Sequence, residues 1–318
     1  MTLKIYIDGA EGTTGLQLKQ RLSLHSETQI LDVDNNKRKN LKYKLEKFSN
    51  ADLIFLCLPD HDAKLMVAEI EKNFGSQKVI IDASTAHRVS DGWIYGFPEL
   101  HQTQRKHIKQ SNRISNPGCY PTGALALIRP LVDNKIIDTS SLLVINAVSG
   151  FSGGGKKLIE FFSKNEKDKF YHYSTFLDHK HNEEIKHYSL LDNSPVFCPS
   201  VGSFPQGMAV SVPLHYDWFS SKVKGKDIFE LFKDHYSSDT LININALNSK
   251  NQLTDNGFLS PEVLIGTNFI DISIFSNDKT GQIWLISRLD NLGKGASGAA
   301  LQNMNLRFGF DENLGVCL

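Results

Sequence analysis

Cysteine is scarce in this sequence, with four residues in 318. None of the four belongs to a C-x-x-C pair, so the sequence predicts neither a disulfide framework nor a structural zinc site. Cys57 lies in the apolar run Leu53–Leu58, Cys198 is also expected in the core, and Cys317 belongs to the tail. Only Cys119 has neighbours that indicate chemistry.

Net charge is absent as well, because 35 Lys and Arg residues balance 35 Asp and Glu residues. This balance excludes the basic footprint of a nucleic-acid-binding protein, although a local group of donors still permits an anionic substrate. The sequence has no run approaching the ~18 consecutive apolar residues of a membrane span, and no signal-peptide pattern at its start. We therefore expect a cytoplasmic protein with a small-molecule partner, and neither nucleic acid nor a membrane.

A glycine-rich turn follows the first strand-like segment, Leu3–Ile7, and leads into a helix-like run. Its glycines are spaced by three, as in a variant of the G-x-G-x-x-G turn. Residues without Cβ let the backbone approach a pyrophosphate, and free N–H groups at a helix start bind it. A glycine-rich connection without a ligand is the alternative interpretation. The residues assigned to a dinucleotide here are Gly9, Gly12, Thr13, Thr14 and Gly15.

Three more strand-like segments follow this turn: Gln29–Val33, Ala51–Leu58 and Lys78–Ser84. The second is strongly apolar, as expected of a buried parallel strand. Ligands of such sheets bind beyond the carboxyl ends of the strands, which is where Ser84 falls. The first half of the chain is therefore predicted to be a Rossmann-type domain, with Ser84 in its cofactor site.

The segment after the second strand carries both acidic and basic residues. An acidic residue there suits the ribose hydroxyls of NAD, whereas basic residues suit the 2′-phosphate of NADP. The basic residues Lys37, Arg38 and Lys39 favour NADP(H), with Lys37 and Arg38 assigned to it. The alternative is that they form the solvated start of a helix.

The segment Ser115–Gly123 places Cys119 at a tight turn that opens a helix-like run. A thiolate at such a position is stabilised by the helix dipole and by free N–H groups, which also stabilise an oxyanion. This is the setting of a covalent nucleophile, and a structural cysteine is the alternative.

Two further features favour an anionic substrate. The glycine-rich segment Ser149–Lys157 is expected to be a loop whose N–H groups form an anion nest, with Ser149 and Gly150 binding substrate or released phosphate. A flexible connection is the alternative. Arg88 is a second candidate, because guanidinium groups bind phosphate and carboxylate through two hydrogen bonds.

The His179-x-His181 pair with a downstream glutamate has a spacing that also occurs in metal sites. We expect no metal, because the nucleophile is already a cysteine.

These segments together resemble the N-acetyl-gamma-glutamyl-phosphate reductase family, in the family's own order and over nearly the whole chain. The family shares its fold and its thioester mechanism with aspartate-semialdehyde dehydrogenases. Two departures, at His87 and at Asn182–Glu183, leave the polar residues of their motifs in place. The matching segments are Gly9–Gly15, Asp82–Arg88, Tyr95–Leu100, Ser115–Thr122, Ser149–Lys156, His179–Ile185 and Asp290–Gly298.

The resemblance implies roles for individual residues. Cys119 attacks an acyl phosphate, His179 is its acid/base partner, and Glu184 orients the imidazole. It implies a substrate contact for Asn116, a less certain one for His181, and a position for Asn291 near the nicotinamide. The implied reaction is NADPH-dependent reduction of N-acetyl-L-glutamyl 5-phosphate to N-acetyl-L-glutamate 5-semialdehyde plus inorganic phosphate, through a thioester on Cys119, in arginine biosynthesis. The acyl group itself stays open, with aspartyl, N-succinylated and carrier-linked substrates as alternatives.

The predicted fold class is α/β: a Rossmann-type domain plus an α+β catalytic and oligomerisation domain with a mostly antiparallel sheet. The first domain is expected over 1–118, completed by a helix that starts near 291, within 291–318, and the second over 119–290. Strand-like segments such as Leu142–Val148 and Ile283–Ser287 support the second sheet. By resemblance, we expect a homo-oligomer, either a dimer or a tetramer.

Overall fold

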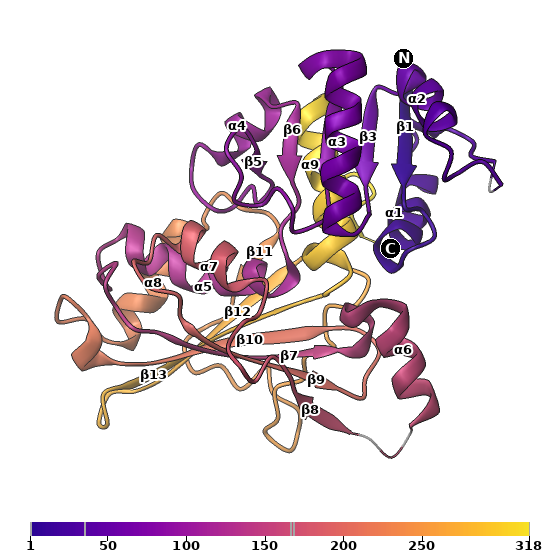
Figure 1. Ribbon diagram of the computed structural model, residues 1–318. Coiled ribbons are helices and arrows are strands. Elements are labelled where there is room, and N and C mark those ends of the chain that lie inside the picture. Colours follow the sequence, from indigo (N-terminus) through magenta and orange to yellow (C-terminus); the bar gives the residue numbers. More distant parts are fainter. Residues whose placement is uncertain (1, 35, 166, 168, 318) are drawn as a thin grey trace. The chain divides into compact units, whose positions relative to one another are not determined.

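Figure 1 shows the computed structural model, which describes residues 2–34, 36–165, 167 and 169–317. The ends of the predicted domain ranges at 1 and 318 lie outside the described residues, as does Asn35 after the second strand. The chain forms two compact units. The first contains Met1–Gly118 and Ala296–Leu318, and the second is Cys119–Gly295.

The first unit is built on a six-stranded sheet in the order β2-β1-β3-β4-β6-β5, in which every neighbouring pair is parallel. Its strands are β1 (Leu3–Asp8), β2 (Thr28–Ile30), β3 (Leu53–Leu56), β4 (Val79–Asp82), β5 (Ile94–Tyr95) and β6 (Arg113–Ser115). Its helices are α1 (Thr13–Ser23), α2 (Leu41–Asn50), α3 (Asp60–Phe74), α4 (Gln104–Gln110) and α9 (Gly298–Phe308), with a 3-10 turn η1 (Gly75–Gln77).

Alternating side chains of this sheet pack into two separate cores, as the two-residue period of a strand requires. Ile5 and Phe55 pack with residues of α1 and α9, whereas Tyr6 and Ile54 pack with residues of α2 and α3. Helices therefore cover both faces, and the predicted Rossmann-type fold is confirmed.

Two element boundaries differ from the sequence prediction. The second strand ends at Ile30 instead of Val33, because the backbone leaves the sheet and the Asp34 N–H donates to the Tyr43 hydroxyl on α2. The predicted helix start at Asn291 is also wrong. Residues Gly293–Ser297 form a π turn, η4, and α9 begins only at Gly298.

The second unit is built on a seven-stranded mixed sheet in the order β11-β12-β13-β10-β7-β9-β8. Four of its six neighbouring pairs are antiparallel, which confirms the mostly antiparallel prediction. Its strands are β7 (Val144–Gly150), β8 (Phe170–His172), β9 (Val196–Gly202), β10 (Met208–His215), β11 (Ile242–Ile244), β12 (Ile270–Asn277) and β13 (Gln282–Leu289).

Helices α5 and α8 pack on one face of this sheet, and α7 packs on α5 (Figure 1). The Ser287 hydroxyl of β13 donates to the Gly123 carbonyl of α5 at 2.9 Å, which marks the face that α5 covers. Within the described residues, no helix is long and apolar enough to span a membrane. The helices of this unit are α5 (Cys119–Asp133), α6 (Gly155–Lys164), α7 (Asn182–Ser189) and α8 (Gly225–His235), with 3-10 turns η2 (Phe151–Gly154) and η3 (Tyr216–Trp218).

Candidate active site

In the first unit, the predicted dinucleotide residues form the turn between β1 and α1. Gly9 has φ +86°, and a Cβ there would lie 2.2 Å from the Cys57 carbonyl oxygen. A Cβ on Gly15 would lie 2.4 Å from the Gly9 carbonyl oxygen, so glycine is required at both positions. Among the described residues, no side chain caps α1 at Gly12, and Thr13 and Thr14 form its first turn. This shape fits a pyrophosphate.

The predicted 2′-phosphate residues follow β2 on the surface. Lys37 forms an exposed ion pair with Asp34 at 3.6 Å, and Arg38 is exposed in the same turn. An exposed pair of this kind is weak, so it leaves the Lys37 ammonium free to exchange partners. A deeper pair lies at the same edge of the sheet, where Lys44 Nζ is 2.7 Å from Asp8 Oδ2.

Ser84 lies just beyond β4, as predicted, and is buried. Its hydroxyl donates to Asp82 Oδ2 at 2.7 Å, and the same carboxylate oxygen lies 2.6 Å from His87 Nδ1. The His87 ring stacks on Trp93 with ring centroids 4.3 Å apart. Ser84 is therefore part of a buried network that closes the carboxyl end of β4.

Arg88 and Asn116 are buried beside each other, and their observed contacts are structural. The Arg88 guanidinium donates to the carbonyl oxygens of Asn116 at 2.9 Å and Ala83 at 3.2 Å. Asn116 donates from Nδ2 to the Ala296 carbonyl and accepts at Oδ1 from Asn303 Nδ2. The two residues predicted to bind substrate thus hold the backbone that leads into Gly118, and their substrate contacts stay a prediction.

In the second unit, Cys119 is the first residue of α5 and is partly buried. Gly295 of the π turn passes close by: a Cβ there would lie only 2.6 Å from the Cys119 Cβ. Within the described residues, no cysteine forms a disulfide. Burial, with smaller contributions from Asp82 and Asp8, raises the pKa of Cys57 to about 12, so this thiol stays protonated.

The rings of both predicted histidines lie against the ring of Tyr120, the residue after Cys119. The ring centroids of His179 and His181 lie 5.9 and 6.0 Å from that of Tyr120, and 4.7 Å from each other. His181 precedes α7, and Glu184 in the first turn of α7 is 2% exposed. The fold therefore brings both predicted histidines to the amino end of α5, and α7, which carries Glu184, packs on α5.

Aromatic side chains line the His179 imidazole. Tyr173 and Phe197 lie at ring-centroid distances of 5.6 and 5.1 Å from it. Burial, followed by the charge of Lys180, lowers the pKa of His179 to about 4, so its imidazole is neutral near pH 7. Sequence reasoning missed Tyr173; its place six residues before His179, in a segment rich in aromatic residues, was the available signal.

The predicted anion nest at Ser149–Lys157 is wrong for its first part. Gly150 ends strand β7, and η2 and α6 follow without a loop. The N–H groups of Gly150, Phe151 and Ser152 donate to carbonyls of residues 204–207, because that segment runs alongside. The Ser149 hydroxyl donates to the Gly150 carbonyl at 3.0 Å.

Asn291 lies in the second unit, and both ends of its amide are engaged there. Its Oδ1 accepts from the Gly207 N–H at 2.7 Å, and its Nδ2 donates to the Ser152 hydroxyl at 3.0 Å. The side chain is 2% exposed. It therefore ties the segment before β10 to η2, and its predicted cofactor contact stays a prediction.

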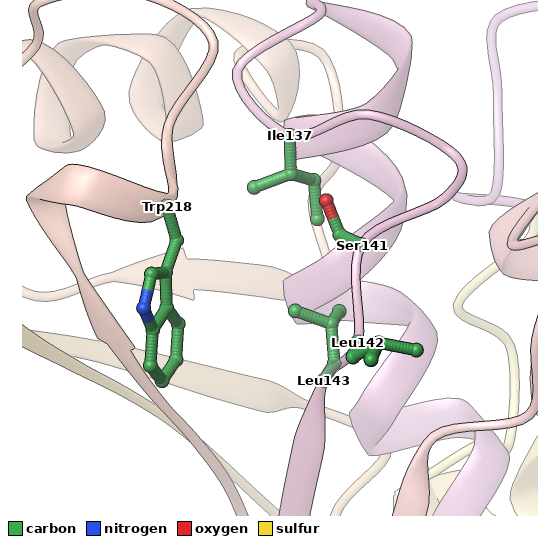
Figure 2. Close-up of a pocket in the computed structure, with 5 residues that line it drawn as sticks. All are labelled: Ile137, Ser141, Leu142, Leu143 and Trp218. Atoms are coloured by element: carbon green, nitrogen blue, oxygen red, sulfur yellow. The ribbon is translucent and has the colours of Figure 1, made fainter.

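A separate pocket of about 290 Å³ lies in the second unit, between the segment before β7 and η3 (Figure 2). It contains no predicted site residue. In the described part of the chain, no group of three or more His, Cys, Asp or Glu side chains could hold a metal ion. The pocket is lined by Ile137, Ser141, Leu142, Leu143 and Trp218.

Two family models match the chain. One, described as the NAD binding domain of semialdehyde dehydrogenase, matches residues 4–111, and the other, described as its dimerisation domain, matches residues 119–291. An N-acetyl-gamma-glutamyl-phosphate reductase from Trichormus variabilis is 41% identical over 321 residues, covering 98% of this chain and 99% of the relative. One from Allorhizobium ampelinum is 41% identical over 311 residues, covering 96% and 99%.

Solved structures show the same fold. A probable aspartate-semialdehyde dehydrogenase from Pseudomonas aeruginosa has a TM-score of 0.71 at 13% identity, over 97% of this chain and 99% of that one. Aspartate semialdehyde dehydrogenase with NADP from Candida albicans has a TM-score of 0.62 at 14% identity, over 96% and 98%.

Proposed function

Because the chain belongs to the N-acetyl-gamma-glutamyl-phosphate reductase family, we propose that it reduces N-acetyl-L-glutamyl 5-phosphate to the 5-semialdehyde with release of inorganic phosphate. The cofactor is NADP(H), and the reaction serves arginine biosynthesis. The observation that carries the proposal is the position of Cys119 at the first residue of α5, beside the Tyr120 ring that both His179 and His181 contact.

The reaction begins with attack of the Cys119 sulfur on the acyl carbon. A C–S bond forms and the bond from carbon to the phosphate oxygen breaks. Inorganic phosphate departs, and a thioester remains on Cys119. Neutral His179 accepts the thiol proton in this step, and Glu184 orients its imidazole. The positive end of the α5 helix dipole, at which Cys119 lies, stabilises negative charge on the carbonyl oxygen.

When bound, NADPH supplies the hydride that reduces the thioester carbonyl. His179 then returns its proton to the oxygen, which gives a hemithioacetal on Cys119. Removal of the same proton lets the C–S bond break, so the aldehyde leaves and the thiolate is regenerated. Gly9, Gly12, Thr13, Thr14 and Gly15 would hold the pyrophosphate of the cofactor, with Lys37 and Arg38 at its 2′-phosphate.

Substitution Cys119→Ser tests the nucleophile. We expect phosphate-dependent reduction of NADP⁺ by N-acetylglutamate semialdehyde to fall at least about 10³-fold, because a serine hydroxyl is not ionised near neutral pH. NADPH binding, measured by fluorescence titration, should survive. Unchanged turnover would remove Cys119 from the mechanism.

Comparison of aldehyde substrates tests the acyl group. With phosphate and NADP⁺ present, N-acetylglutamate semialdehyde should be turned over in preference to aspartate semialdehyde and to an N-succinylated analogue. A higher kcat/KM for aspartate semialdehyde would reassign the substrate.

The chain is further proposed to act in the cytoplasm as a homo-oligomer, a dimer or a tetramer. Support for assembly comes from an apolar row on the second unit's sheet: Pro213, Trp284 and Phe275 are register partners on β10, β13 and β12. Trp284 is 50% exposed and its two neighbours are partly buried, and apolar side chains grouped in this way at a surface are typical of a protein interface.

A further inference from the structure

A buried ion pair lies directly before the glycine turn of the first unit. Asp8 is the last residue of β1, and Lys44 reaches it from α2 with 2.7 Å between Nζ and Oδ2. The side chains of Lys44 and Asp8 are 11% and 6% exposed, so solvent screens the pair little. A single residue step separates this carboxylate from Gly9.

Other titratable groups that interact with the Asp8 carboxylate include one acid, one hydroxyl and the Cys57 thiol. The negative charge of Asp62 on α3 acts on Asp8, and the charge of Asp8 acts in turn on the Tyr6 hydroxyl of β1. Burial raises the pKa of Asp8 above its ordinary value, and Lys44 and a hydrogen bond from the Gly9 backbone offset part of this rise. The Lys44 ammonium is therefore the cation that compensates this carboxylate at close range.

A dinucleotide brings a doubly charged pyrophosphate to the turn that starts at Gly9. Like charges in a poorly screened environment repel each other strongly, so an uncompensated Asp8 would oppose that binding. We infer that Lys44 is a positioning residue for the cofactor: it neutralises Asp8 and thereby keeps the Gly9–Gly15 turn able to accept a pyrophosphate. This inference rests on the proposed function, which places the dinucleotide at this turn.

The position of Lys44 also separates its role from that of the basic residues after β2. Its ammonium is already engaged with Asp8 in the protein interior, whereas Lys37 and Arg38 are exposed. Without Lys44, the Asp8 carboxylate would repel the pyrophosphate, and NADPH and NADH share this group. Loss of Lys44 should then weaken both nucleotides equally, without changing the preference between them.

The experiment measures NADPH and NADH affinity by fluorescence titration for Lys44→Met, Asp8→Asn and the double variant. Lys44→Met should weaken both nucleotides by about tenfold or more, as expected for one unscreened charge near the phosphates. Asp8→Asn should bind at least as tightly as wild type, and the double variant should return to within about threefold of wild type. Lys42→Met removes an exposed charge from the same helix and should leave both affinities unchanged.

Several outcomes would overturn the inference. These are wild-type affinity in Lys44→Met, a double variant as weak as Lys44→Met, or a loss confined to NADPH, which would place Lys44 on the 2′-phosphate. If Lys44→Met alone does not fold, as judged by thermal unfolding, Asp8→Asn and the double variant are compared, and a weaker double variant contradicts the inference. A wild-type protein that binds neither nucleotide would instead refute the proposed function itself.

Discussion

At the scale of single residues, the charge state of His179 decides how the proposed chemistry responds to pH. Burial favours the neutral imidazole, and Lys180 adds to this effect, whereas Asp178 opposes it. With its pKa at about 4, His179 accepts a proton throughout the neutral range and loses that ability only as the pH falls toward 4. The acid limb of kcat/KM should therefore lie near pH 4.

Two neighbouring substitutions should move this limb in opposite directions. Lys180→Met removes a charge that lowers the pKa of His179, so the acid limb should shift to higher pH. Asp178→Asn removes a charge that raises it, so the limb should shift to lower pH. The measurement is kcat/KM from about one pH unit below the pKa of His179 up to about pH 8, with thermal unfolding followed over the same range. Shifts of the same sign would show that another group sets the limb.

His179 also makes a contribution to stability that depends on pH. The unfolded chain binds a proton at this residue below its ordinary pKa of 6.5, whereas the folded protein does so only near 4. The free energy of unfolding should therefore fall as the pH drops from about 6.5 to about 4. His179→Gln, which cannot titrate, should flatten that part of the stability profile.

Substitution of each histidine by glutamine separates the catalytic role predicted for His179 from the substrate contact predicted for His181. His179→Gln should lower kcat by about 10²-fold or more, as loss of a general base does, with KM changed little. His181→Gln should raise KM more than it lowers kcat if it contacts substrate. The reverse pattern would exchange the two roles, since both rings lie at similar distances from Tyr120.

At the scale of elements, the π turn η4 determines the room available to Cys119. The Gly295 N–H donates to the Asp290 carbonyl, five residues earlier, at 2.9 Å, and this wider turn brings Gly295 against Cys119. Gly295→Ala would place a methyl group 2.6 Å from the Cys119 Cβ, which is closer than carbon atoms approach. We expect kcat to fall by about tenfold or more, since small displacements of a nucleophile are costly.

The matched control for this substitution is Gly12→Ala, whose added Cβ would come no closer than 3.4 Å to another residue. It should leave the rate of Cys119 alkylation by iodoacetamide unchanged, whereas Gly295→Ala should alter that rate. If Gly295→Ala is alkylated and turns over like wild type, the π turn does not position the sulfur.

Elements with a strong local pattern could be predicted from the sequence. The apolar strands β3 and β4, the glycine turn after β1 and the helix that starts at Cys119 are all present. The short strands β5, β6, β8 and β11 were not predicted, since two or three residues carry no periodicity. The longer strand β9 was also missed. The π turn was also missed, because its small residues match a helix and its wider hydrogen bonding depends on the fold.

The candidate site divides along the same line. Residue type and a local turn predict a nucleophile at Cys119, whereas the roles predicted for the histidine pair came from the family resemblance. The contacts of Arg88, Asn116 and Asn291 are with backbone far away in the sequence, such as Ala296 for Asn116 and Gly207 for Asn291. No local pattern encodes such partners, so sequence alone left a binding role and a structural role indistinguishable for these residues.

At the scale of the whole molecule, the second unit's sheet gives the last prediction. Along β13, Ser287 faces α5, so Trp284 lies on the opposite face by the alternation of a strand. There it continues a row with Pro213 and Phe275, and it is half exposed. A charge within an apolar subunit interface is not tolerated, because it loses its hydration without gaining a partner.

Trp284→Glu should therefore lower the molecular mass measured by light scattering. A tetramer should become a dimer or a monomer, and a dimer should become a monomer of 35.7 kDa. Trp218→Glu is the matched control, because this tryptophan is equally exposed, at 52%, but lies on η3 outside the row. Assembly should be unchanged in the control. If Trp284→Glu folds and keeps the wild-type mass, subunits meet through another surface, and the apolar row needs a different explanation.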